Sequence, residues 1–190
     1  MGKSRKEISA LTEDQKRLGA ITKFTAIEVA GLQKEYAKLG FSQTEILNAT
    51  EATLSLAAAV ETDLANASMV AGSTLRGFGL DASEMGRVVD VMAKSFTSSA
   101  LDIENFRESM KYVAPIAKAS GVSIEFTTAM LGKLADAGIK GSQAGTSLRR
   151  ILAEMAKTGK PASQALDEFA KSGISVNDAM DEVGRTAQTA

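Results

Sequence analysis

The sequence predicts an all-α protein, folded as a compact bundle of about ten short helices joined by glycine-capped turns. Two observations support this prediction. Apolar residues recur at spacings of three and four, as on one face of a helix, and period-two alternation is sustained nowhere, so we expect essentially no sheet. The helical runs are also separated by a recurring pattern: a glycine, an apolar residue and a polar residue able to cap the next helix.

The glycine pattern places the ends of the expected helices. It occurs at Gly40-Phe41-Ser42, Gly79-Leu80-Asp81, Gly121-Val122-Ser123 and Gly173-Ile174-Ser175, with Gly138-Ile139 as a variant. A glycine there can take the left-handed conformation that ends a helix, and the apolar residue after it makes the accompanying contact. Between these positions we expect helices over residues 6–20, 26–39, 43–60, 63–78, 82–97, 103–119, 124–137, 142–157, 162–172 and 176–188.

Several helix starts have a capping box, in which a cap residue and a glutamate three positions later satisfy each other's backbone N–H groups. The pattern is found at Thr25 with Glu28, Ser42 with Glu45, and Asp81 with Glu84. Two prolines add further boundaries. Pro115 lies inside the run 103–119 and should kink that helix or start a new turn, whereas Pro161 suits a first helical position.

The spacing of the caps is compatible with a repeat. Gly40, Gly79 and Gly121 are about forty residues apart, which is the length of a two-helix solenoid unit. The apolar positions between them do not superimpose well, however, and Gly138 breaks the period. We therefore predict the compact bundle, with solenoid-like stacking as the minor alternative.

Composition excludes several classes of function. The chain has 190 residues, 44% hydrophobic and 24% charged, as expected for a globular protein, and its net charge of -1 offers no general attraction to nucleic acid. It has no histidine and no cysteine, so the commonest general base, thiolate nucleophiles and zinc-thiolate sites are missing. We expect no enzyme activity, no catalytic residues, no cofactor and no metal site.

The most specific stretch is Ala137 to Arg150, in which Gly141 and Gly145 are one helical turn apart. A bare helix start can bind phosphate, but a P-loop needs a lysine and then Ser or Thr after its last glycine, and here Thr146 and Ser147 follow. Close packing of another helix over the two glycines is the better interpretation.

Five stretches of the chain stand out together: LGAITKFTA at 18–26, AKLGFS at 37–42, FGLD at 78–81, YVAP at 112–115 and AGIKGSQAGTSLR at 137–149. In this order and with similar spacing, they resemble the conserved N-terminal region of bacteriophage tail tape measure proteins. The resemblance covers about residues 5 to 155. It assigns a packing or assembly role to Gly138, Gly141, Gly145, Thr146, Leu148 and Arg149.

The resemblance implies a structural component of a virion or prophage-derived particle. Such a protein sets tail length during assembly and is released to assist DNA ejection. The implied partners are the tail tube protein, tail assembly chaperones, tail-tip or baseplate proteins and other copies of the chain, with membrane contact at infection. The implied location is the lumen of the virion tail, and the host bacterial cytoplasm during assembly.

The chain is short for a ruler, because a helix gains only about 1.5 Å per residue. We therefore expect a segment of a longer protein. Residues 1–24 form an N-terminal helix with an artificial or cut edge, 25–157 the helical tape measure core, and 158–190 a helical hairpin leading to the rest. With only 5% aromatic residues, the core should be of modest stability and able to unfold for passage through a narrow tube.

Two alternatives stay open at this point. The first is a helical protein-interaction module unrelated to phage, which would share the predicted fold. The second is a peptidoglycan hydrolase that works through paired carboxylates. Its candidate residues are Glu104, Glu108 and Glu125, although their positions on polar faces also suit a solvated surface.

Overall fold

The computed structural model describes residues 5–157, and these residues are helical apart from short turns. The elements are α1 (Arg5–Ile21), α2 (Ala26–Lys38), α3 (Gln43–Ala59), α4 (Leu64–Phe78), the 3₁₀ turn η1 (Ala82–Glu84), α5 (Met85–Ser98), α6 (Ile103–Ala119), α7 (Ile124–Asp136) and α8 (Gly141–Lys157). The prediction of an all-α fold is confirmed. Eight α-helices rather than about ten are found, because the last two expected helices, with Gly173 and Pro161, lie outside the described residues.

The local signals act largely as predicted. At Ser42 the glutamate Glu45 accepts from the cap N–H at 2.6 Å, and the same reciprocal bonds join Thr25 and Glu28, so both capping boxes are confirmed. Gly40, Gly79, Gly121 and Gly138 all have positive φ, and in each case the N–H of the next, apolar residue bonds to the carbonyl five positions back. These bonds satisfy carbonyls that the helix end would otherwise leave open.

One local prediction was wrong, and one of the two outcomes expected at Pro115, a new turn, is not found, while the kink stays a prediction. Glu84 does not reach back to Asp81, because its carboxylate pairs with the Arg87 guanidinium at 2.7 Å; the Asp81 carboxylate instead accepts from the Ser83 N–H and starts a 3₁₀ turn. Pro115 starts no new turn, since α6 continues past it to Ala119. Pro115 lies on the exposed side of α6, where water can satisfy the carbonyl left without a donor.

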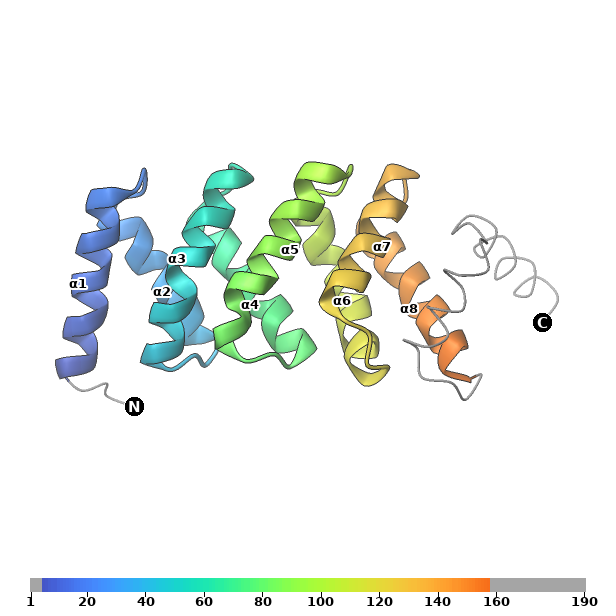
Figure 1. Ribbon diagram of the computed structural model, residues 1–190, viewed down its shortest axis with the longest axis horizontal. Coiled ribbons are helices and arrows are strands. Elements are labelled where there is room, and N and C mark those ends of the chain that lie inside the picture. The colour runs from blue at the N-terminus through green and yellow to red at the C-terminus, as the bar shows by residue number, and fades with distance from the viewer. Residues whose placement is uncertain (1–4, 158–190) are drawn as a thin grey trace.

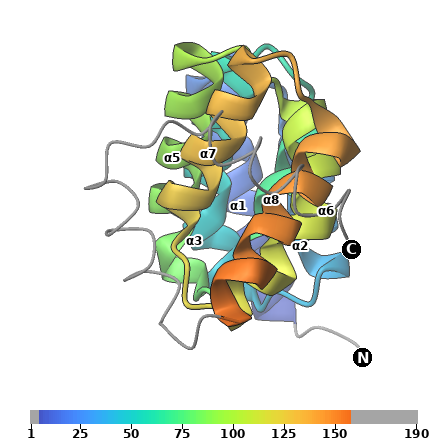
Figure 2. The same ribbon diagram turned by 90° about the vertical axis from the view of Figure 1, so that its right-hand side faces the viewer.

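The helices are arranged in two rows, α1, α3, α5 and α7 in one and α2, α4, α6 and α8 in the other (Figure 1). Each helix packs against the next helix of its own row, and sequence neighbours also pack together, with α5 and α6 meeting through the edge-to-face pair of Phe96 and Phe106. The view along the stack shows the two layers face to face (Figure 2). Within one continuous core, the helices thus stack as successive pairs, which is the solenoid-like arrangement that the sequence offered as the alternative.

The core runs between the two rows from Leu18 of α1 to Leu152 of α8. Its largest fully buried side chain is Tyr36 of α2, whose hydroxyl pairs with that of Thr53 on α3. Burial raises the pKa of Tyr36 well above its ordinary value, so this group stays neutral and ties the two layers together. Because each helix is held mainly by its neighbours, the ends of the stack can differ in how firmly they are held.

Candidate assembly interface

The glycine-rich stretch forms the turn from α7 to α8. Gly138 has a φ of 83° and ends α7, with its N–H bonded to the Ala135 carbonyl at 3.0 Å. The N–H of Ile139 bonds to the Leu134 carbonyl at 2.8 Å, and its half-buried side chain packs on the core. Gly141, with a φ of 57°, then begins α8. Two left-handed glycines three residues apart thus turn the chain from one row into the other.

The two glycines of α8 lie directly against α6. A Cβ placed on Gly145 would lie 2.8 Å from the Ser109 Cα and closer still to its carbonyl oxygen, so the backbones themselves are in contact. At Gly141 a Cβ would lie 3.1 Å from the Asn105 side-chain oxygen. The Ser109 hydroxyl donates to the Gly141 carbonyl at 2.7 Å. Any larger side chain at 145 would have to push the two helices apart.

This contact fixes the register of the two helices. Gly141 faces Asn105, and Gly145, four residues on, faces Ser109, so α6 and α8 run in the same direction. Arg149 is the next residue in that row of α8 and lies beside Tyr112 of α6. The two side chains share a surface hollow of about 360 Å³.

The other two residues of the predicted set lie elsewhere on α8. Leu148 is 1% exposed and belongs to the core. Thr146 is exposed, and its hydroxyl donates to the Ser142 carbonyl at 2.7 Å. The structure therefore brings Gly141, Gly145 and Arg149 together along α6, while Gly138 shapes the turn. Their role in assembly stays a prediction.

Comparison with known proteins assigns the family. A family model described as phage-related minor tail protein matches residues 12–190. The chain belongs to this family. It is 42% identical over 159 residues to the tape measure protein of Pneumococcus phage Dp-1, and 36% identical over 162 residues to the probable tape measure protein of Escherichia phage P2. Each alignment covers 84% of this chain but only 14% and 20% of the respective relative, and no solved structure matches.

Membership of the phage-related minor tail protein family makes the chain a phage tail component and removes the alternative of a module unrelated to phage. It also agrees with the resemblance read from the five stretches, of which the Gly138 to Arg149 run now has a defined place between two rows of helices. The chain spans between a seventh and a fifth of the length of these curated relatives. What the whole proteins do is therefore a separate question from what this segment does.

The carboxylates of the hydrolase alternative are all engaged by cations. Glu125 binds Arg87 through both oxygens, at 2.5 and 3.0 Å, and the hydrogen bond from Arg87 lowers the pKa of Glu125 to about 2. Glu108 pairs with Lys111 at 2.6 Å, which lowers its pKa, and Glu104 pairs with Arg107 at 2.8 Å. A glycosidase general acid needs a raised pKa. The environments of Glu125 and Glu108 shift their pKa values in the opposite direction.

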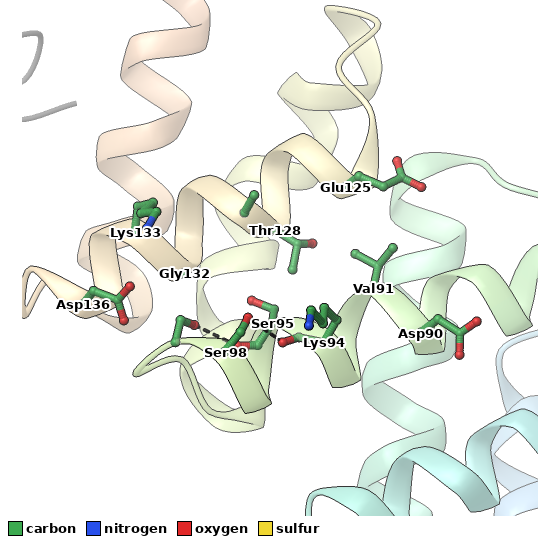
Figure 3. Close-up of a pocket in the computed structure, with 12 residues that line it drawn as sticks. Asp90, Val91, Lys94, Ser95, Ser98, Glu125, Thr128, Gly132, Lys133 and Asp136 are labelled. Atoms are coloured by element: carbon green, nitrogen blue, oxygen red, sulfur yellow. Dashed lines mark hydrogen bonds between the residues drawn. The ribbon is translucent and has the colours of Figure 1, made fainter. Parts of the chain in front are cut away.

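A hollow of about 450 Å³ lies between α5 and α7 (Figure 3). Small residues contribute to its lining, among them Ser95, Gly132 and Thr128, and the buried Thr128 hydroxyl has no hydrogen-bond partner in the described residues. Lys94 and Lys133 lie at its rim on opposite helices.

The described residues, 5–157, also lack a metal site and a membrane-spanning helix. No group of three or more carboxylates there is placed to hold a metal ion. No helix in that range is long and apolar enough to cross a membrane.

The partner side of the glycine contact was missed by sequence reasoning. Ser109 is the key residue, because it offers α8 a small surface and a hydroxyl. A signal was present: Ser109 interrupts the apolar stripe formed by Phe106, Met110 and Val113, and a small polar residue inside such a stripe indicates a close approach. The sequence does not show which glycine Ser109 meets, because that depends on the register between α6 and α8, which are far apart in sequence.

Proposed function

We propose that this chain is a folded segment of a tail tape measure protein, which sets tail length during assembly and is released to assist DNA ejection. The observation that carries the proposal is the identity of 36 to 42% to two tape measure proteins over 84% of the chain. The segment is structural rather than catalytic, in keeping with the ionised state of Glu125 and Glu108.

The segment itself is not the ruler. As one straight helix, residues 5–157 would span about 230 Å. They are instead divided among eight helices lying side by side, so most of that length is folded away. In our proposal the length-setting part lies in the remainder of the protein, and this segment forms a folded unit attached to it.

The proposed location is the lumen of the virion tail, and the host bacterial cytoplasm during assembly. The proposed partners are the tail tube protein, tail assembly chaperones, tail-tip or baseplate proteins and other copies of the chain, with membrane contact at infection. A stack of helices held by nearest neighbours can open from one end, which suits a protein that must leave through a narrow tube.

The test uses the full-length protein in the phage or prophage that encodes it. An in-frame deletion in a helical region outside residues 1–190 should shorten the tails, measured by electron microscopy, by about 1.5 Å per deleted residue. An equal deletion inside residues 5–157 should instead abolish tails, because it removes part of the stack. Tails of unchanged length after the first deletion would contradict the length-setting function.

A further inference from the structure

One exposed aromatic side chain is left unexplained by the fold. Among the described residues, the large apolar side chains with substantial exposure are Ile8, Ile21, Ile27 and Tyr112. The three isoleucines come from the α1–α2 end of the stack. Tyr112 is 40% exposed and lies on α6, in the row that also contains α8. Tyrosine with an apolar ring in a hollow and a polar tip in water is typical of protein interfaces.

Tyr112 borders the hollow of about 360 Å³, which we call the Tyr112 hollow. Its lining residues are Lys111, Tyr112, Pro115, Ile116 and Arg149. The lining therefore combines an aromatic ring, two apolar side chains and two cations. Such a site can take an apolar side chain together with a neighbouring negative charge.

Arg149 is placed there by the glycine contact. Gly141, Gly145 and Arg149 follow one another at intervals of four residues, so they form one row along α8. The first two have no side chain and let α8 approach α6 until its backbone meets Ser109. The close approach brings Arg149 over the α6 surface next to Tyr112.

The charges around the hollow differ. Lys111 is paired with Glu108 at 2.6 Å. Arg149 has no carboxylate within ion-pair distance in the described part of the chain, although the guanidinium is well suited to bind one through two hydrogen bonds. Helices α6 and α8 together have six Lys or Arg and three Glu residues, although the whole chain has a net charge of -1. At the hollow itself, Arg149 is the charge that no carboxylate of the described residues offsets.

We propose that the Tyr112 hollow docks an acidic segment of a partner protein. A carboxylate of that segment pairs with Arg149, and an apolar side chain beside it enters the hollow against Tyr112 and Ile116. Tyrosine and arginine are the residue types that most often dominate binding energy at interfaces. A single-stranded nucleic acid is disfavoured, because stacking platforms use successive aromatic rings and here Tyr112 stands alone.

This inference goes beyond the proposed function, since it concerns which surface binds and what chemistry it recognises. It holds whether or not the parent protein sets tail length, and the experiment below does not measure tails. Failure of one proposal therefore leaves the other standing.

The experiment is a titration of the ¹⁵N-labelled 190-residue chain followed by NMR. The probe is a short acetylated peptide of Ala and Glu with one central Leu. Shifts should concentrate on amides of α6 and α8 around Tyr112 and Arg149. Arg149→Gln and Tyr112→Ala should each weaken binding by about tenfold, as expected for central interface residues. Arg150→Gln, which removes the same charge one residue along, should change the dissociation constant by less than about twofold.

Each contrary result overturns the proposal. If a peptide with Gln in place of Glu binds equally well, the hollow recognises only the apolar side chain and not the carboxylate. Equal losses from Arg149→Gln and Arg150→Gln would mean that bulk charge, not the hollow, attracts the peptide. A single-stranded oligonucleotide that binds more tightly at the same amides would assign a nucleic acid instead, and no shifts at all would mean no site. Circular dichroism checks that the variants fold, which is expected because both side chains are exposed.

Discussion

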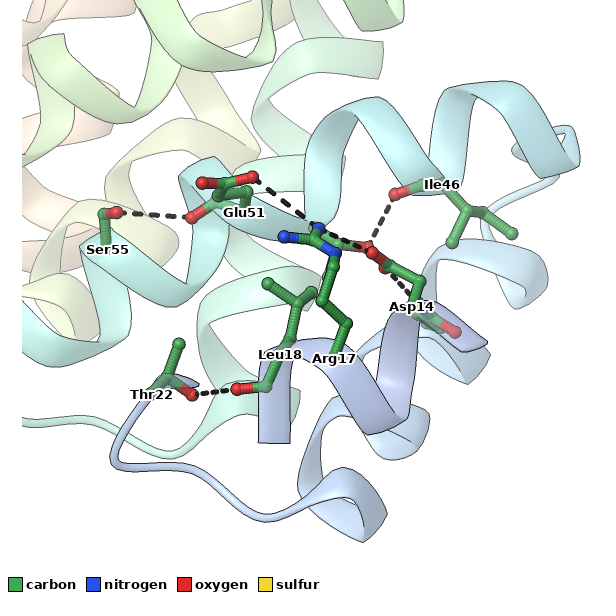
Figure 4. Close-up of polar contacts among 9 residues, drawn as sticks. Asp14, Arg17, Leu18, Thr22, Ile46, Glu51 and Ser55 are labelled. Atoms are coloured by element: carbon green, nitrogen blue, oxygen red, sulfur yellow. Dashed lines mark hydrogen bonds and ion pairs between the residues drawn. The ribbon is translucent and has the colours of Figure 1, made fainter. Parts of the chain in front are cut away.

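Helices α1 and α8, which bound the described stack, differ in how much apolar surface they bury and in how many polar contacts hold them. Helix α8 meets α6 through backbone contact at Gly145 and buries Leu148 and Leu152. Helix α1 buries a single side chain, Leu18, among its residues 8–21. Its other contacts are the half-buried Leu11 on the core, a close approach of Gly19 to the Ala26 backbone of α2, and a polar group. In that group Arg17 lies between Asp14 of its own helix and Glu51 of α3, at 2.8 and 3.8 Å (Figure 4).

The polar contact of α1 centres on Gln33 of α2, which is 3% exposed. Its amide accepts from Gln15 at 2.8 Å and donates to Asp14 at 3.0 Å. Such bonds replace bonds to water and contribute only about 0.5–1.5 kcal/mol each. Apolar burial contributes more, and α8 buries two leucines where α1 buries one, so we expect α1 to open before α8. One stack of helices can thus combine a firmly held helix with a releasable end.

The largest effect should come from filling the glycine contact. Gly145→Val places a branched side chain against the Ser109 backbone and should lower the free energy of unfolding by about 3 kcal/mol or more. Urea denaturation followed by circular dichroism measures it. The control is Gly31→Ala in α2, where a Cβ meets nothing within 4 Å, and which should raise stability by about 1 kcal/mol. A Gly145→Val protein as stable as the parent would show that the helices are not in contact there.

A matched pair of leucines compares the two ends directly, because Leu18 and Leu148 are each 1% exposed. Leu148→Ala should lower the global stability by about 2.5 kcal/mol, the usual cost of such a cavity. Leu18→Ala should leave the main unfolding transition nearly unchanged and instead speed tryptic cleavage after Lys23, in the turn behind α1. Equal shifts of the main transition would mean that the stack unfolds as one unit and that its ends do not differ.

A smaller effect is expected within the polar contact. Asp14→Asn keeps the shape of the side chain but removes the charge that holds Arg17, and should weaken α1 docking by about 1 kcal/mol. The neighbouring pair of Glu13 and Lys16 is largely exposed, so Glu13→Gln should cost almost nothing. Cleavage after Lys23 again provides the measurement. If the two variants behave alike, the polar contact does not hold α1.

The smallest effect concerns the ion pair between α5 and α7. The pKa of Glu125 is lowered from 4.5 to about 2. The stability that its ionised carboxylate contributes is therefore fully present above pH 4.5 and is lost as pH falls toward 2. Because the side chains of Arg87 and Glu125 are 43% and 44% exposed, the contribution of this ion pair to the free energy of unfolding should stay below about 1 kcal/mol. Glu125→Gln should therefore reduce the loss of melting temperature between about pH 6 and pH 3. If the Glu125→Gln variant loses as much melting temperature as the parent, other groups cause the acid sensitivity.

How much of this could be read from the sequence depended on how local each feature is. The caps at Gly79 and Gly121 and the boxes at Thr25 and Ser42 involve neighbours along the chain, and they were predicted. The pairing of Glu84 with Arg87 was not predicted, because the Arg87 guanidinium and the backbone N–H of Asp81 both compete for the Glu84 carboxylate. The glycines of α8 and the small Ser109 of α6 each indicated a close contact, but nothing local indicated that they would meet each other. The two-row arrangement likewise follows from packing between distant helices.

Hydrogen exchange of the unmodified chain, resolved by helix, tests the central claim most directly. The account predicts that amides of α6 and α8 exchange slowest and that those of α1 exchange fastest among the described helices, with α1 opening independently of the rest. Equal protection of α1 and α8, or slower exchange in α1, would contradict the claim that the glycine contact is the firm part of the stack and the polar end the releasable one.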